Sequence, residues 1–161
     1  MTNKKDRKVA LILHNIRSVY NVGSIFRTAD TAGVSEIYLT GFTPAPKDRF
    51  GRLRKDLTKV ALGAEKDISW YALETADMAI NKLKDGGFYV IAIEQALHSV
   101  DYKKIKPKHK TAFILGSETD GLSENILKKC DIVAEIPMKG KKESLNVAVS
   151  AGIAVFRILS L

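Results

Sequence analysis

The sequence has few of the residues that mark disulfide-rich or metal-binding proteins. Its single cysteine, Cys130, cannot form a disulfide within the chain, which fits a reducing compartment, and we expect a cytoplasmic protein. The 3 histidines are scattered along the chain, and Cys130 has no partner at the spacing of a metal site. The sequence therefore predicts no bound metal.

No segment has the composition of a membrane span or an export signal. The most apolar stretch, at the C-terminus, contains Asn146, Ser150 and Arg157, whereas a bilayer crossing needs about 20 mostly apolar residues. The apolar run from Val9 to Leu13 is too short for the core of a signal peptide. We expect neither membrane insertion nor export.

Three common enzyme motifs are missing as well. No G-x-G-x-x-G follows the first apolar run, as a dinucleotide-binding fold of that type requires. Gly116 and Gly121 have the spacing of a phosphate-binding P-loop, but Leu122 and Ser123 stand where that loop needs Lys and Ser or Thr. No G-x-S-x-G marks a nucleophilic serine.

Positive charge is what the chain has in excess. Lysine and arginine outnumber aspartate and glutamate by 26 to 18, a net charge of +8. This balance favours polyanions such as nucleic acid, through attraction and counterion release. A chain of 161 residues is most simply one domain, and we expect residues 1–161 to form it, with a basic tail over residues 1–8.

Short apolar runs alternate with helical patterns along the chain. Strands are predicted at Val9–His14, Glu36–Leu39, Ile68–Tyr71, Phe88–Ile93, Ala112–Leu115 and Ile132–Ile136. Helices are predicted at Tyr20–Ala32, before Gly63, at Glu74–Lys84, at Leu122–Lys129 and at Ser144–Ser160. Continuous apolar strands alternating with helices are typical of a buried parallel sheet. The predicted fold class is α/β, a parallel sheet with helices on both faces.

Polar residues and glycines follow three of the predicted strands. They occupy Asn21–Ala29, Gly116–Gly121 and Ile136–Asn146. Each stretch has a simpler explanation, namely a helix start, a tight turn, or a cap at Ser144 on a terminal helix that is apolar on every side and so belongs in a core or interface. Ligands of open parallel sheets lie beyond the carboxyl ends of strands, however, and three such stretches at one edge favour a ligand site.

These three stretches resemble, in order and separation, the motifs of the SpoU (TrmH-like) family of RNA ribose methyltransferases, in the SPOUT superfamily of knotted enzymes. The similar residues are Asn21-x-Gly23-x-x-x-Arg27-Thr28-Ala29, then Leu115-Gly116-Ser117-Glu118-x-x-Gly121-Leu122, then Ile136-Pro137-Met138 with Ser144-Leu145-Asn146-Val147. Leu62-Gly63-Ala64-Glu65 is a weaker likeness. The resemblance covers about residues 9–159.

The resemblance implies a C-terminal segment threaded through a deep trefoil knot, which general rules of topology argue against. It also implies S-adenosylmethionine as the cofactor. The residues that would line its pocket are Ile93, Gly116, Ile136, Met138, Ser144 and Leu145.

The reaction that the resemblance implies is methyl transfer to a ribose 2′-hydroxyl of tRNA or rRNA. The implied catalytic residues are Arg27, Asn21, Glu118, Ser144 and Asn146. Arg27 matches the family's catalytic arginine, and two roles stay open for it: a deprotonated base, or a charged group that grips phosphate and stabilises the developing alkoxide. A guanidinium pKa above about 12 favours the second role.

Family members are homodimers that pack through the C-terminal and first helices, and the neighbouring subunit supplies the catalytic arginine. Many also carry an added RNA-binding domain. We expect none in this sequence, so the core itself would contact RNA. The first candidates are Lys47, Arg49, Phe50, Arg52 and Arg54, followed by the basic stretches at Lys103–Lys110 and Lys139–Lys142, unless these are simply solvated charge.

Two other functions are compatible with the resemblance. One is a catalytically inactive RNA-binding protein that keeps the SPOUT fold, and the other is a SPOUT enzyme that methylates a base nitrogen. The intact set of Arg27, Glu118, Ser144 and Asn146 disfavours both. The sequence leaves open which nucleotide is modified and whether a helper protein is needed.

Overall fold

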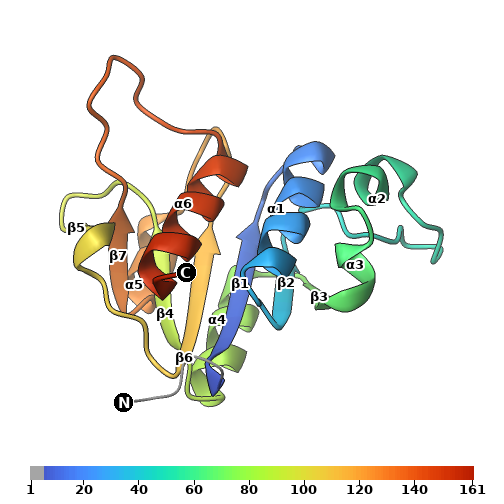
Figure 1. The fold of residues 1–161 in the computed structure, drawn as a ribbon, viewed down its shortest axis with the longest axis horizontal. Helices are drawn as coiled ribbons and strands as arrows, with labels where there is room; N and C mark the ends of the chain where they lie inside the picture. The colour runs from blue at the N-terminus through green and yellow to red at the C-terminus, as the bar shows by residue number, and fades with distance from the viewer. Residues whose placement is uncertain (1–5) are drawn as a thin grey trace.

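A computed structural model describes residues 6–161 as a seven-stranded sheet with helices on both sides (Figure 1). The strands are β1 (Lys8–His14), β2 (Glu36–Thr40), β3 (Ser69–Leu73), β4 (Tyr89–Ile93), β5 (Val100–Asp101), β6 (Lys110–Leu115) and β7 (Ile132–Glu135). The helices are α1 (Val19–Thr31), α2 (Lys55–Ala61), α3 (Ala64–Asp67), α4 (Ala76–Asp85), α5 (Glu124–Lys129) and α6 (Val147–Leu159), with a 3₁₀ helix at Tyr102–Lys104.

Every strand pair of the sheet is parallel, in the order β3-β2-β1-β6-β4-β7-β5. The central strands β1, β6 and β4 are almost wholly buried, because helices cover both of their faces. The order also makes β6, β4 and β7 neighbours, so the loops that leave their carboxyl ends start side by side. The predicted α/β fold with a parallel sheet is confirmed.

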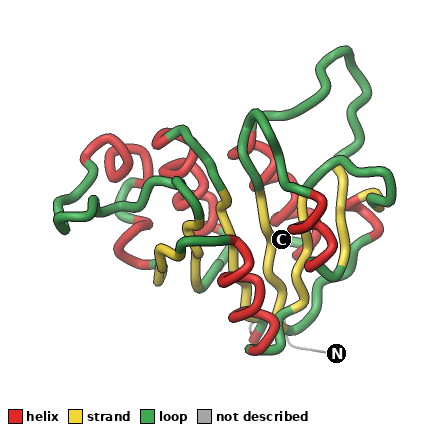
Figure 2. Tube along the Cα trace, turned by 180° about the vertical axis from the view of Figure 1, so that it is seen from behind, coloured by secondary structure: helices red, strands yellow, loops and turns green. Residues whose placement is uncertain are grey.

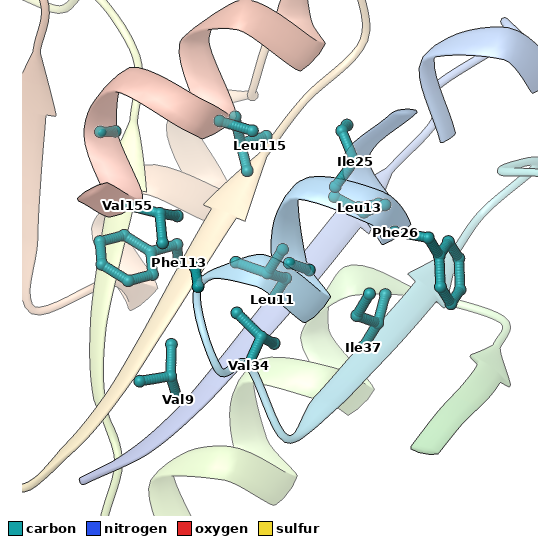
Figure 3. Close-up of a cluster of buried hydrophobic side chains, with 14 of the residues drawn as sticks. Val9, Leu11, Leu13, Ile25, Phe26, Val34, Ile37, Phe113, Leu115 and Val155 are labelled. Atoms are coloured by element: carbon teal, nitrogen blue, oxygen red, sulfur yellow. The ribbon is translucent and has the colours of Figure 1, made fainter. Parts of the chain in front are cut away.

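The strands divide their side chains between two hydrophobic layers. On one face, Val9, Leu11 and Leu13 of β1 pack with α1 and α6, as Figure 3 shows for the labelled cluster. On the other face, Ala10 and Ile12 pack against α4 and α5. This period of two is the ordinary alternation of a strand, here buried on both sides.

Several helices begin at a side chain that caps them. Ser18 accepts a hydrogen bond from the Asn21 backbone N–H, and Thr75 and Ser123 do the same for α4 and α5. Asn146 caps α6 by accepting from the N–H groups of Ala148 and Val149, at 2.9 and 3.3 Å.

The C-terminal helix therefore starts at Val147, and the prediction that it starts at Ser144 is wrong. Asn146 is the better cap because its side-chain oxygen reaches two orphan N–H groups, so Ser144 stays in the preceding loop. That loop, between β7 and α6, projects beyond the sheet in both ribbon and tube views (Figures 1 and 2).

Three further differences from the predicted elements are local. The short strand β5, which was not predicted, lies before the basic stretch Lys103–Lys110 and pairs with β7 through only two residues. The 3₁₀ helix that follows it includes the first residues of this stretch. α3 follows Gly63, which adopts a left-handed φ of 93°. Lys8 belongs to β1 rather than to a tail, and residues 1–5 of that predicted tail lie outside the described residues. Within residues 6–161, no helix combines the length and hydropathy needed to span a bilayer.

Candidate active site

The loops after β4, β6 and β7 enclose a cavity of about 330 Å³. This volume falls within the range of small-molecule sites, about 300–1,000 Å³. All six residues predicted to bind the cofactor lie on its wall, namely Ile93, Gly116, Ile136, Met138, Ser144 and Leu145. Glu118 lines it as well, whereas Asn21, Arg27 and Asn146 do not. The sheet order brings these residues together from three distant segments.

Close approach of the backbone shapes the loop after β6. Ser117 pairs with Gly121 across a tight turn, and a Cβ on Gly116 would lie 2.6 Å from the Gly121 carbonyl. Gly121 itself has a φ of 64°, a conformation that glycine adopts without strain. The two glycines therefore let the two sides of the turn approach closely, so that backbone atoms form part of this wall of the cavity.

Glu94, which sequence reasoning missed, holds that turn against β4. Its carboxylate accepts hydrogen bonds from the backbone N–H groups of Gln95 and Leu122, at 2.9 and 3.0 Å. The side chain of Gln95 in turn donates to the carbonyl of Glu143, at 2.6 Å. Both residues directly follow the apolar run of β4, so their position after a strand was the available signal.

A chain of side-chain hydrogen bonds joins the three motif loops. The amide nitrogen of Asn146 donates to Oδ1 of Asn21, and the amide nitrogen of Asn21 donates to Oε1 of Glu118, both at 3.1 Å. Asn146 also caps α6 through its oxygen, so most of its hydrogen-bonding capacity is used within the scaffold. The relay fixes the start of α1, the β6 turn and the start of α6 relative to one another.

Glu118 accepts hydrogen bonds from other donors besides Asn21. The backbone N–H groups of Arg17 and Ser18 also point at its carboxylate, at 3.2 and 3.5 Å. Partial burial acts to raise the pKa of Glu118, but these hydrogen bonds outweigh it and hold the pKa below its ordinary value. The carboxylate is therefore ionised at neutral pH and serves as a fixed acceptor.

Arg27 lies on the exposed outer side of α1 and does not line the cavity of its own chain. Beside Arg27, the same helix forms a groove with α6, of about 550 Å³. The groove is lined by Tyr20, Asn21, Ser24, Thr28, Asn146, Ala148, Val149, Gly152 and Ile153, so it includes two residues of the relay. Tyr20 and Val149 there are 67% and 48% exposed. The groove thus combines polar side chains with exposed apolar ones, and it is open to solvent beside Arg27.

The predicted RNA-contacting loop forms a small hairpin. Lys47 pairs with Leu53, and Asp48 accepts from the backbone N–H groups of Phe50 and Arg52 at its tip. Phe50 is 66% exposed, and the guanidinium carbons of Arg49 and Arg52 lie 4.8 and 5.0 Å from its ring centroid. Arg54 follows directly and precedes α2. The hairpin thus presents an aromatic ring flanked by two cations.

Comparison with known proteins identifies the family. The model of the SpoU rRNA Methylase family matches residues 8–156. A protein of Staphylococcus aureus (strain MSSA476) described as "Putative TrmH family tRNA/rRNA methyltransferase" is 32% identical over 155 residues, which cover 96% of this chain and 60% of that protein. The chain thus spans less than two thirds of that relative's length.

Two solved structures share the fold. The AdoMet-bound rRNA methyltransferase of Sinorhizobium meliloti superposes with a TM-score of 0.84 at 29% identity, over 94% of this chain and 55% of that one. The TrmH/SpoU tRNA-modifying enzyme of A. aeolicus superposes with a TM-score of 0.82 at 23% identity, over 96% and 76% of the two chains. Both the family match and the sheet with its three converging loops lead to one conclusion: the chain belongs to the SpoU rRNA methylase family.

Proposed function

We propose that the protein transfers a methyl group from S-adenosylmethionine to a ribose 2′-hydroxyl of tRNA or rRNA. The observation that carries this proposal is the cavity formed where β4, β6 and β7 end, two of whose loops, those after β6 and β7, are tied to the start of α1 by the Asn146–Asn21–Glu118 relay. Family membership and the cofactor-bound relative from S. meliloti support the same activity.

The cavity fits this cofactor in size and chemistry. The side chains of Ile93, Ile136, Met138 and Leu145 supply apolar walls for an adenine ring, and the narrow turn at Gly116 leaves backbone groups to contact polar edges. When bound, S-adenosylmethionine supplies an electrophilic methyl group on a sulfonium sulfur. Ser144 lies on the same wall, where its hydroxyl can bind the cofactor or the ribose.

The chain's own residues position the acceptor. The relay keeps Glu118 ionised and Asn146 fixed, so the start of α6 presents a constant geometry to a ribose. We assign to Arg27 an electrostatic role, in which its charge grips a phosphate and stabilises the oxygen as the hydroxyl proton leaves. A base role for Arg27 is the second candidate.

A homodimer would complete the site. Arg27 lies outside the cavity of its own chain, and the adjacent groove exposes Tyr20 and Val149. A twofold axis across α1 and α6 would cover these exposed apolar side chains and bring Arg27 toward the partner's cavity. We further propose that the loop between β7 and α6 takes part in the trefoil knot of the superfamily.

The exposed hairpin at 47–53 is the proposed RNA contact. Its Phe50 offers a stacking surface for a base, and Lys47 and Arg49 offer charge to phosphates. Arg52 and Arg54 add to the positive charge, although Arg52 pairs with Asp48 at 2.9 Å and the Nε atom of Arg54 is buried. The basic stretches 103–110 and 139–142 are second choices.

The deciding experiment is incubation of unmodified total RNA with the protein and labelled S-adenosylmethionine, followed by mapping of alkali-resistant linkages. We expect label at a ribose 2′-oxygen. Label in a base would make the protein a base methyltransferase of the same superfamily. Cofactor and RNA binding without any label would favour an inactive RNA-binding protein.

A further inference from the structure

A second cavity, of about 510 Å³, lies between the end of the 47–53 hairpin and the helices α2 and α3. We name it the α2–α3 cavity. It is separate from the active-site cavity and shares no lining residue with it. Its lining residues are Leu53, Lys55, Thr58, Lys59, Leu62, Gly63, Glu65 and Lys66.

The unusual member of this set is Glu65. Its side chain is only 7% exposed, and its Oε2 atom is buried without a hydrogen-bond partner among the described residues. None of the three lysines on the cavity wall forms an ion pair with it in residues 6–161. Buried carboxylates are normally paired, because an unpaired one loses hydration without compensation. Glu65 therefore lines the cavity and carries an enclosed acceptor that no other described residue uses.

The rest of the wall suits a nucleotide. Leu53 and Leu62 are 55% and 65% exposed and offer apolar surface to a flat ring. Lys55, Lys59 and Lys66 offer charge to a phosphate. The proposed RNA-contacting hairpin runs directly into this cavity through Leu53, so a strand of RNA that stacks on Phe50 continues past it.

The carboxylate selects among the bases. Single-stranded RNA is read by splaying out bases and bonding their Watson–Crick edges. Guanine presents two adjacent donors on that edge, N1–H and the exocyclic amine, which match the two oxygens of a carboxylate. Adenine and cytosine present an amine beside an acceptor, and uracil presents one N–H between two acceptors. A carboxylate therefore suits guanine best.

We propose that the α2–α3 cavity binds an unstacked guanine of the RNA substrate, and that the Glu65 side chain turns toward the cavity on binding so that its two oxygens accept hydrogen bonds from the Watson–Crick edge of the base. The proposal rests on RNA being the substrate, and it adds a base-reading site outside the methyl-transfer cavity. Because Glu65 is buried and unpaired in the free protein, its role in binding is separable from any role in folding.

The test compares Glu65→Gln with Glu124→Gln, a control that removes the same charge from the exposed start of α5. The probes are two single-stranded oligoadenylates, one with a single guanosine and one with inosine, which lacks the exocyclic amine, in its place. We expect the wild type and the control to bind the guanosine probe about tenfold more tightly than the inosine probe. Glu65→Gln should lose this preference.

A thermal unfolding scan completes the test. Replacing a buried, unpaired carboxylate by a neutral amide should leave the melting temperature unchanged or raise it. Equal guanosine preference in Glu65→Gln and wild type would overturn the proposal, as would a lower melting temperature with loss of cofactor binding. These binding measurements need no turnover, so they stand apart from the assay for methyl transfer. If RNA fails to bind but a second copy of the chain does, the cavity is a protein interface instead.

Discussion

The side-chain amide of Asn146 donates a hydrogen bond to Oδ1 of Asn21 at 3.1 Å, although the two residues are 125 positions apart. Asn21 passes the connection on to Glu118, so each of the three motif loops contributes one residue. The relay converts three loops that could move separately into one rigid edge.

Replacing Asn21 by alanine removes the centre of the relay. Asn21 is nearly buried, so the unpaired groups left on Asn146 and Glu118 should lower the free energy of unfolding by about 1–3 kcal/mol. Methyl transfer should fall more than cofactor affinity, because Asn21 does not line the cavity. Urea denaturation and calorimetry measure the two effects. Asn125→Ala, on the exposed side of α5, is the control and should change neither.

Gly116→Ala tests the narrow turn of the cavity wall. A Cβ at residue 116 would meet the Gly121 carbonyl at 2.6 Å, so the turn must move. Such overpacking costs about 1–3 kcal/mol of stability, and we expect weaker cofactor binding by calorimetry. Gly140→Ala is the matched control, since nothing lies within 4 Å of a Cβ there. Equal affinities in the two variants would remove Gly116 from the proposed cofactor site.

Mixed dimers test whether the site is shared between subunits. Arg27→Ala and Asn146→Ala chains should each be nearly inactive alone. Co-expressed with different tags and purified as the mixed species, they should regain about one working site, because one of the two composite sites then has both native residues. Activity no higher than that of the single variants would show that Arg27 and Asn146 do not act across a subunit interface.

The pH dependence of stability should report on Glu118. Its pKa is lowered in the folded protein, so its hydrogen bonds stabilise the fold fully above the unfolded pKa, about 4.3, and progressively less as the pH falls through the folded pKa. The wild type should therefore exceed Glu118→Gln in stability at pH 7. The difference should shrink in acid, as measured by urea denaturation at each pH. A difference that stays constant down to low pH would contradict this origin.

Neutralising the hairpin tests the proposed RNA contact. Replacing Arg49, Arg52 and Arg54 by glutamine should weaken RNA binding and flatten its salt dependence. The logarithmic slope should fall by about 0.7 for each phosphate of a single strand that the protein no longer neutralises. Lys128→Gln, on α5 across the sheet, serves as the control for one charge. If the slope is unchanged in the triple variant, RNA binds elsewhere, and the stretches 103–110 and 139–142 become the next candidates.

Local patterns in the sequence predicted most of the framework. The continuous apolar runs at Val9–His14 and Phe88–Ile93 marked central strands, because residues buried on both faces need no polar alternation. The order of glycine and polar stretches after the strands indicated which edge of the sheet would carry a site. The net charge of +8 indicated a polyanion as partner.

Only the tertiary structure decided the features that depend on distance. The helix α6 starts at Val147, whereas the sequence predicted a start at Ser144. The choice between two possible capping residues depends on where the preceding loop enters the helix. The relay through Asn21 and the hydrogen bond from the Leu122 backbone N–H to Glu94 each join segments that no periodicity connects. The burial of the Glu65 carboxylate likewise depends on how the elements around it pack. Sequence patterns indicate which residues prefer burial or a turn. The partner of a polar side chain depends instead on which strands lie next to each other in the folded sheet.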